Sequence, residues 1–366
     1  MEQIDNPVLE APGYIFQLTS FPATCGDSFW LTYGTLDDQH HVLIDGGTAS
    51  GDANIGKHIE KLPNNSELEL MIVTHYDSDH IEGIRKLLLA DSLPIHIKEI
   101  WFNDYDRLDT SIELETFGAR MGEELAILIN KHDIPWNISF NEKAVVISSE
   151  NPKSLPIVTL PGGLKLTLLS PYQKQLSELK PVWEQQILNL DKEAGYGAKI
   201  GKRKLENFGS TAPEFEKLWK NTFSGDNDEG NGSSIAVLAE FNGKSILFSA
   251  DAFSEVIMKS LDILERKKIT LLKVSHHGGS RNTDPKLIDQ IDCRHFLFST
   301  NKGSKPTEQT LAYILKSTQN PTFYFNYKSQ NTKDWENDIS KMEYGYHTQY
   351  PSEEALSIDV HKITED

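Results

Sequence analysis

The chain has 366 residues, and its 54 acidic and 36 basic side chains give a formal net charge of −18. Hydrophobic residues make up 38% of it, too many for an unfolded acidic tail and enough for the core of one large or two modest domains. Its two cysteines exclude a disulfide framework, and no run approaches the roughly 20 apolar residues of a membrane span. The first residues also lack the features of a signal peptide. We expect a cytoplasmic protein with no membrane partner.

The negative charge argues against a general nucleic-acid coat, because the repulsion of phosphate would have to be overcome locally. Two short basic runs could provide such a local surface, or they could simply be solvated. They are Lys199 with Lys202, Arg203 and Lys204, and Arg266 with Lys267 and Lys268.

The first half of the chain reads as short strands joined by tight turns, because apolar runs of strand length are bounded by Gly, Pro or Asp. These runs lie at 14–19, 29–33, 41–44, 70–73 and 97–102. Helical periodicity predicts a helix after His80 and an amphipathic helix over 114–131. Strand patterns return at 144–147, 157–160 and 164–169.

The segment from about 173 to 230 is polar, and we interpret it as a helical insertion or lid outside the core. Beyond it, strands at 235–240, 245–249, 269–274, 295–299 and 322–327 alternate with helices at 254–266, 285–291 and 307–317. Early hairpins and later alternation favour the α/β (α+β) class, as a four-layer αββα sandwich. The principal domain would span 1–328. Residues 329–366 would form a C-terminal extension that could add one edge strand at 356–363.

The strongest chemical signal is VTHYDSDH at 73–80, between an apolar strand and a helix. Two histidines and two aspartates within six positions can converge on one point, and imidazole and carboxylate hold Zn²⁺ or Mn²⁺ at neutral pH. A helix cap would explain one aspartate and neither histidine. This run therefore predicts a metal site.

Two later motifs also place polar side chains at strand ends. Asp251 ends the apolar run ILFSA, a position that alone is more typical of a helix cap. His276 and His277 follow the buried run LLKVS and precede two glycines. A satisfied core histidine would explain one of this pair, not both. Taken with the first motif, the economical account is a dinuclear metal site.

These residues carry a family resemblance. The patterns LIDGG at 43–47, HxDxDH at 75–80, Asp251 and HHG at 276–278 resemble the metallo-β-lactamase-fold hydrolases. CGDS at 25–28, NGSS at 231–234 and LKVSHHG at 272–278 are similar to the hydrolase domain of the DNA-uptake channel protein ComEC and its stand-alone soluble relatives. The resemblance covers about 15–316, and it implies a metallo-β-lactamase-type sandwich for 1–328.

The resemblance also implies a ligand set for two divalent ions, Zn²⁺ or Mn²⁺. His75 and Asp77 would bind the first ion. Asp79 and His80 would bind the second, and Asp251 would bridge the two.

One histidine of the HHG run would complete the second site. We favour His277, because an HG dipeptide is the usual form of that ligand in the fold, and His276 would then contact substrate. Asp45 looks like the buried acid of the fold that supports the metal loop. Asp27 and Asn231 match the turn and the Asn…Ser element of the ComEC-like group, and we expect them to support the ligands.

Many relatives have a third histidine for the first site between HxDxDH and the strand-end aspartate. Here that interval contains only His96 and His132, and neither has a convincing context. The ComEC-like group often lacks this ligand too. Its absence implies a first site with lower affinity for its ion and chemically harder ligands, which tolerates Mn²⁺ as well as Zn²⁺.

The resemblance implies a phosphodiesterase or nuclease that uses a metal-bridging hydroxide as nucleophile. Asp79 or Asp251 would orient the water, and His276 would contact phosphate or protonate the leaving group. The basic run Lys202, Arg203 and Lys204 would guide the nucleic acid or small phosphodiester substrate.

Two alternatives remain open. One is a hydrolase of a small non-nucleic ester, such as a phosphocholine ester, a cyclic nucleotide or a lactone. Its closed pocket could be lined by aromatic residues, which are more often core: Trp101, Phe102, Tyr105, Trp183 and Trp219. The other is a non-catalytic, metal-binding regulatory subunit.

Overall fold

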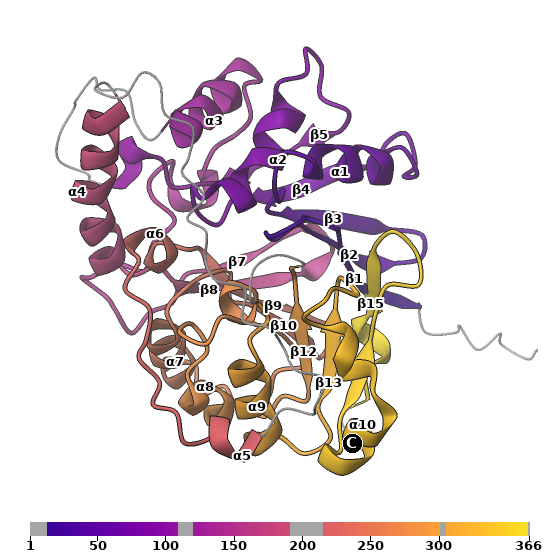
Figure 1. Ribbon diagram of the computed structural model, residues 1–366. Coiled ribbons are helices and arrows are strands. Elements are labelled where there is room, and N and C mark those ends of the chain that lie inside the picture. Colours follow the sequence, from indigo (N-terminus) through magenta and orange to yellow (C-terminus); the bar gives the residue numbers. More distant parts are fainter. Residues whose placement is uncertain (1–12, 109–119, 191–214, 301–304, 365–366) are drawn as a thin grey trace, which may run out of the picture.

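The computed structural model describes residues 13–108, 120–190, 215–300 and 305–364. It has a mixed α/β architecture in which two multi-stranded sheets are accompanied by helices (Figure 1). Among the helices of these ranges, none has the length and apolar character that a membrane crossing requires.

The first sheet has the strand order β15-β1-β2-β3-β4-β5, and β6 also pairs with β4. Strands β15 to β3 are antiparallel, whereas β4 runs parallel to β3, β5 and β6. The strands are β1 (Tyr14–Ser20), β2 (Phe29–Thr35), β3 (Gln39–Ile44), β4 (Glu67–Ile72), β5 (His96–Ile97), β6 (Ile100–Trp101) and β15 (Leu356–Asp359).

The second sheet has the order β14-β13-β12-β11-β10-β9-β8-β7. Strands β7 to β10 pair antiparallel, and β10 to β14 pair parallel. The strands are β7 (Ile157–Thr159), β8 (Lys165–Ser170), β9 (Ala236–Phe241), β10 (Lys244–Phe248), β11 (Leu271–Lys273), β12 (His295–Phe298), β13 (Thr322–Phe325) and β14 (His347–Gln349).

The α-helices of the described residues lie between and after these strands. They are α1 (Gly51–Ile59), α2 (Ser78–Leu88), α3 (Arg120–Lys131), α4 (Gln173–Leu190), α5 (Phe215–Leu218), α6 (Glu229–Gly232), α7 (Ser254–Ile263), α8 (Pro285–Gln290), α9 (Glu308–Ser317) and α10 (Asp338–Tyr344). Short 3-10 turns span Tyr105–Leu108, Ile138–Phe140, Pro161–Gly163, Ser275–Gly278, Lys333–Glu336 and Val360–Lys362.

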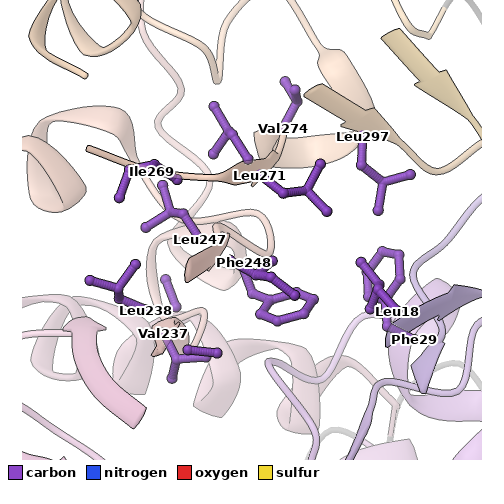
Figure 2. Close-up of a cluster of buried hydrophobic side chains, with 14 of the residues drawn as sticks. Leu18, Phe29, Val237, Leu238, Leu247, Phe248, Ile269, Leu271, Val274 and Leu297 are labelled. Atoms are coloured by element: carbon purple, nitrogen blue, oxygen red, sulfur yellow. The ribbon is translucent and has the colours of Figure 1, made fainter. Parts of the chain in front are cut away.

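The larger hydrophobic cluster joins the two sheets. The rings of Phe29 on β2 and Phe248 on β10 lie 5.8 Å apart between their centroids. Figure 2 shows them in one cluster with Leu18 of β1 and Leu297 of β12. Because side chains alternate along a strand, the inward positions of both sheets share this core.

The opposite face of the first sheet carries a second cluster. Trp30, Leu43 and Met71, which alternate with the residues of the first cluster, pack here with side chains of α1, α2, α3 and α4. In Figure 1, α1 to α3 lie beyond the first sheet, and α7 to α9 lie beyond the second. The strands of each sheet are therefore held between helices on one face and the shared core on the other.

Most of the expected elements are confirmed within a few residues. The strand expected at 144–147 is wrong: Ile147 makes only an isolated bridge. The Asn103 side chain instead satisfies both backbone groups of Val145, with Nδ2 donating to its carbonyl (3.0 Å) and Oδ1 accepting from its N–H (2.8 Å). The strand expected at 97–102 is divided into β5 and β6. The first part of the helix expected at 114–131 lies outside the described residues.

The start of the segment expected as an insertion is core. Leu176, Leu179 and Trp183 of α4 are buried in the second cluster. They follow one another at three- and four-residue spacing, so one face of the helix packs inward. Our interpretation of the whole segment as lying outside the core is therefore wrong for α4.

The chain after 328 completes both sheets. The edge strand expected at 356–363 is confirmed as β15, which pairs with β1. In addition, β14 pairs with β13 at the edge of the second sheet, and Trp335 and Tyr346 are buried in the larger cluster.

Candidate metal centre

The predicted ligands lie in loops at neighbouring strand ends of the two sheets. Asp45 follows β3, and the run at 73–80 leads from β4 into α2. Asp251 follows β10, and the two histidines follow β11. Backbone φ is positive at Asp45, Ala250, His276 and His277, and such left-handed positions cluster at functional sites in proteins.

His80 is oriented by the buried Asp45. The Asp45 carboxylate accepts hydrogen bonds from the Thr74 N–H (2.8 Å), the Thr74 hydroxyl (2.7 Å) and His80 Nδ1 (2.7 Å). Because a carboxylate only accepts, Nδ1 of His80 carries a proton, so Nε2 is the ring nitrogen that faces the site, and in the neutral ring it presents a lone pair there. This is the supporting contact expected for Asp45.

His75 is held in the same tautomer. The Thr74 hydroxyl gives its proton to Asp45, so its oxygen accepts from His75 Nδ1 at 3.1 Å. The Ser234 hydroxyl, from the NGSS run, lies 3.3 Å from the same nitrogen. Nε2 of His75 therefore also carries a lone pair.

His277 repeats this arrangement on the second sheet. Its Nδ1 lies 3.1 Å from Asp27 Oδ1 and 3.2 Å from the Ser299 hydroxyl. Its Nε2 lies 3.6 Å from Asp79 Oδ2 and 3.8 Å from Asp251 Oδ2. Asp27 thus contacts a histidine of the predicted ligand set.

The Nε2 atoms of His75, His80 and His277 are buried, and none has a hydrogen-bond partner among the described residues. Oδ1 of Asp251 is in the same condition, and its Oδ2 lies 3.6 Å from His80 Nε2. These gaps are too long for hydrogen bonds but close to the spacing of about 3.4 Å between two ligand atoms that surround one tetrahedral Zn²⁺. The donor set fits divalent ions.

The described residues form several three-member groups whose ligand atoms lie within 4.8 Å of one another. His80 and Asp251 each belong to more than one group. The groups are His75, His80 and Asp251; Asp79, His80 and His277; Asp27, Asp251 and His277; and Asp27, Asp45 and His80. Clustered histidines and aspartates that could bind metal ions are thus present where the sequence predicts them.

The capping alternatives find no support at either aspartate. Asp77 occupies the N-cap position of α2, but its side chain makes no capping hydrogen bond. Its Oδ2 lies 3.7 Å from His75 Nε2, on the side of the site. Asp251 does not cap α7, whose N-cap is Phe253.

The electrostatics of the centre favour charged carboxylates. Burial opposes ionisation of Asp251, but His276, His277 and His80 hold its pKa well below the ordinary value. Burial likewise opposes ionisation of Asp79, and the neighbouring histidines lower its pKa. Ionised carboxylates are the form that binds a cation.

His276 lies at the rim of the site and is partly exposed. Its Nδ1 lies 2.9 Å from Asn282 Oδ1, and its Nε2 lies 3.5 Å from Asp251 Oδ2. Asn282 and Asn231 both donate to Oδ2 of Asp226, at 2.7 and 2.6 Å. This polar network fixes the imidazole, and sequence reasoning identified only two of its members, His276 and Asn231.

Lys273 is a member of the site that sequence reasoning missed. Its side chain is 0% exposed, pairs with Asp27 Oδ2, donates to the Ala250 carbonyl (3.0 Å) and lies 3.8 Å from Asp251 Oδ1. Burial opposes ionisation of Asp27, but Lys273 and then His277 lower its pKa. The sequence feature that could have indicated this role is the single charged residue within the apolar run LLKV.

Other predicted residues lie elsewhere. Lys202, Arg203 and Lys204 lie outside the described residues. His96 pairs with Glu67 on the surface, and His132 lies 2.8 Å from the Leu88 carbonyl. Neither histidine belongs to a candidate metal group among the described residues.

No family model matches the chain. Among curated proteins, the chain is similar to ComE operon protein 3 of Bacillus subtilis (strain 168), with 26% identity over 110 residues. The match covers 27% of this chain and 14% of that protein. The chain thus spans a small part of the relative, and this similarity is weak and partial.

Proposed function

We propose that the protein is a dinuclear metal-dependent hydrolase of the metallo-β-lactamase type that cleaves phosphodiester bonds, as a phosphodiesterase or nuclease. The observation that carries the proposal is a set of three buried Nε2 atoms, which have no hydrogen-bond partner among the described residues and cluster with the carboxylates of Asp79 and Asp251. The two sheets share one core, and helices lie beyond both, which supports the four-layer sandwich of that fold. The partial match to a ComE operon protein agrees with the motif resemblance.

Divalent ions in such a centre supply Lewis-acid activation of water and neutralisation of phosphate charge. The chain's own residues prepare the site for them. Asp45 and Asp27 hold His80 and His277 with their Nε2 atoms directed inward. Asp79, at the mouth of the site, would orient the attacking water. These fixed dipoles and charges need little reorganisation during the reaction.

His276 would manage the proton of the leaving group. Its Nδ1 is held by Asn282, so its Nε2 faces Asp251 and the approaching substrate. In the neutral form this nitrogen could accept the proton that the attacking water loses, and it could then pass that proton to the leaving oxygen. Burial, partly offset by Asp251, lowers the pKa of His276 and favours the neutral form.

A small, closed aromatic pocket has less support. Trp101, Phe102, Tyr105 and Trp183 are all buried in the core clusters. The indole of Trp219 donates to the Ala312 carbonyl of α9 (2.9 Å). These rings are used for packing, so we keep the small ester as an outcome of the test.

The test is cleavage of labelled single- and double-stranded DNA and RNA with Mn²⁺ or Zn²⁺, for wild type beside Asp79→Asn. The exposed Asp289, on α8, gives a matched control as Asp289→Asn. We expect cleavage by wild type and the control, and a loss of at least about a hundredfold in Asp79→Asn. Full activity in Asp79→Asn would refute the mechanism. Turnover of small esters alone would favour a hydrolase of a small non-nucleic ester. No turnover by metal-loaded protein would favour a metal-binding regulatory subunit.

A further inference from the structure

Lys305 packs against the loop that carries the HHG histidines. A Cβ atom on Gly279 would lie 3.6 Å from Lys305 Cε, so the alkyl stem runs along this loop. Two residues later, the Thr307 N–H donates to the Gly278 carbonyl (3.0 Å) and fixes the start of α9 on the same loop. The stem is therefore held beside the metal centre.

The ammonium of Lys305 has no ion pair within 4.0 Å among the described residues, although its side chain is half-buried. The carboxylates that act on it over longer distances are Asp251, Asp79 and Asp226, which belong to the centre and its rim. Burial nevertheless lowers the pKa of Lys305. A half-buried lysine keeps its ammonium within reach of water, so this group can bind an anion that arrives from solvent.

Lys273, in the same neighbourhood, shows the contrast. It is fully buried, and Asp27 neutralises it at contact distance. Two of the carboxylates that attract Lys305, those of Asp251 and Asp79, are candidate metal ligands, and bound divalent ions would offset their charge. Asp226 would remain at the rim, and an anion that enters the site would supply the negative charge that the ammonium then lacks.

We propose that Lys305 is a specificity-determining residue that binds a non-bridging oxygen of a phosphate ester beside the metal centre. Lysine is a compact point charge that suits phosphate. A lactone or other neutral ester offers no charge to this position, so the substrate class is an anionic phosphoryl compound. This inference rests on the proposed function and deepens it.

The test is binding of inorganic phosphate to the metal-loaded protein by calorimetry, for wild type, Lys305→Met and Lys305→Arg. Lys286→Met, an exposed change on α8, is the control. We expect about tenfold weaker phosphate binding in Lys305→Met, near-normal binding in Lys305→Arg, and no change in the control. With bis(p-nitrophenyl) phosphate as substrate, KM should rise about tenfold in Lys305→Met while kcat changes less.

Unchanged phosphate binding in Lys305→Met, or no phosphate binding by wild type, would overturn the inference. So would loss of bound metal in both Lys305→Met and Lys305→Gln, because the residue would then support the centre itself. The two proposals fail separately. If phosphate binding depends on Lys305 but no ester is hydrolysed, only the proposed function is refuted. If diesters are cleaved but phosphate binding does not depend on Lys305, only this inference is refuted.

Discussion

Replacement of Lys273 by methionine should destabilise the metal-free protein strongly. The change leaves the Asp27 carboxylate, 1% exposed, without its cation, and it removes the hydrogen bond to the Ala250 carbonyl. Breaking a buried pair by removing one partner costs about 3–5 kcal/mol. Ser299 and His277 still contact Asp27, so we expect the lower end, about 3 kcal/mol. For a chain of this length, that lowers Tm by roughly 4 °C.

The assay is urea unfolding in the presence of a chelator at pH 7, with Lys286→Met as the exposed control. A double-mutant cycle with Asp27→Asn isolates the pair, and the double variant should lose less stability than the two single changes added together. Because pairing holds the pKa of Asp27 below its ordinary 3.8, this stabilisation is present at neutral pH and is lost as the pH falls below that value.

A loss of less than about 1 kcal/mol in Lys273→Met, with an unchanged denaturant slope, would refute the reasoning. So would strict additivity in the cycle with Asp27→Asn. Either result would mean that the ammonium and the carboxylate do not depend on each other for their burial.

Four further substitutions have expected outcomes. Burial, and then two neighbouring aspartates, raise the pKa of Glu123 from 4.5 to about 7, so folding takes up a proton in that window and stability falls as the pH rises through it. Glu123→Gln should stabilise by about 1 kcal/mol at pH 8, after discounting for its partial exposure, and by nothing at pH 4, as measured by urea unfolding. A Cβ on Gly26 would lie 1.4 Å from the Asp79 carbonyl oxygen, so Gly26→Ala should displace the metal loop and weaken Zn²⁺ binding in a chelator competition. Gly56→Ala, in open space on α1, should leave Zn²⁺ binding unchanged and add about 0.5–1 kcal/mol of stability. Asp45→Ala frees the imidazole that it orients, and should cost about 10–100-fold in Zn²⁺ affinity; an unchanged affinity would contradict its supporting role.

The clustering of the candidate ligands could be predicted because it follows from local sequence. An apolar run that ends in His or Asp places that side chain just beyond the end of a strand. The structure has this arrangement at His75, after β4, and at Asp251, after β10. The packing of the two sheets then brings the loops that follow these strands together. The tautomers also follow from residues that the motifs include, since Asp45 and Asp27 are the acceptors.

The rest depends on contacts that are distant in sequence. Lys273 lies inside a buried strand, and only the three-dimensional packing shows that Asp27 neutralises it. Asn282 acquires its role through Asp226, more than fifty residues away along the chain. The sequence leaves open whether Trp183 lines a pocket or packs in the core, because a largely polar helix can still have one apolar face. In the structure that face packs in the second cluster.

The proposed function requires that the histidines and aspartates of this site bind two divalent ions. The most direct measurement is equilibrium dialysis of chelator-treated protein against Zn²⁺ or Mn²⁺, with the bound metal counted by mass spectrometry. We predict two ions per chain for wild type, and fewer for Asp251→Asn at the same free concentration. A count of one or none for wild type, or an equal count in Asp251→Asn, would contradict the dinuclear site.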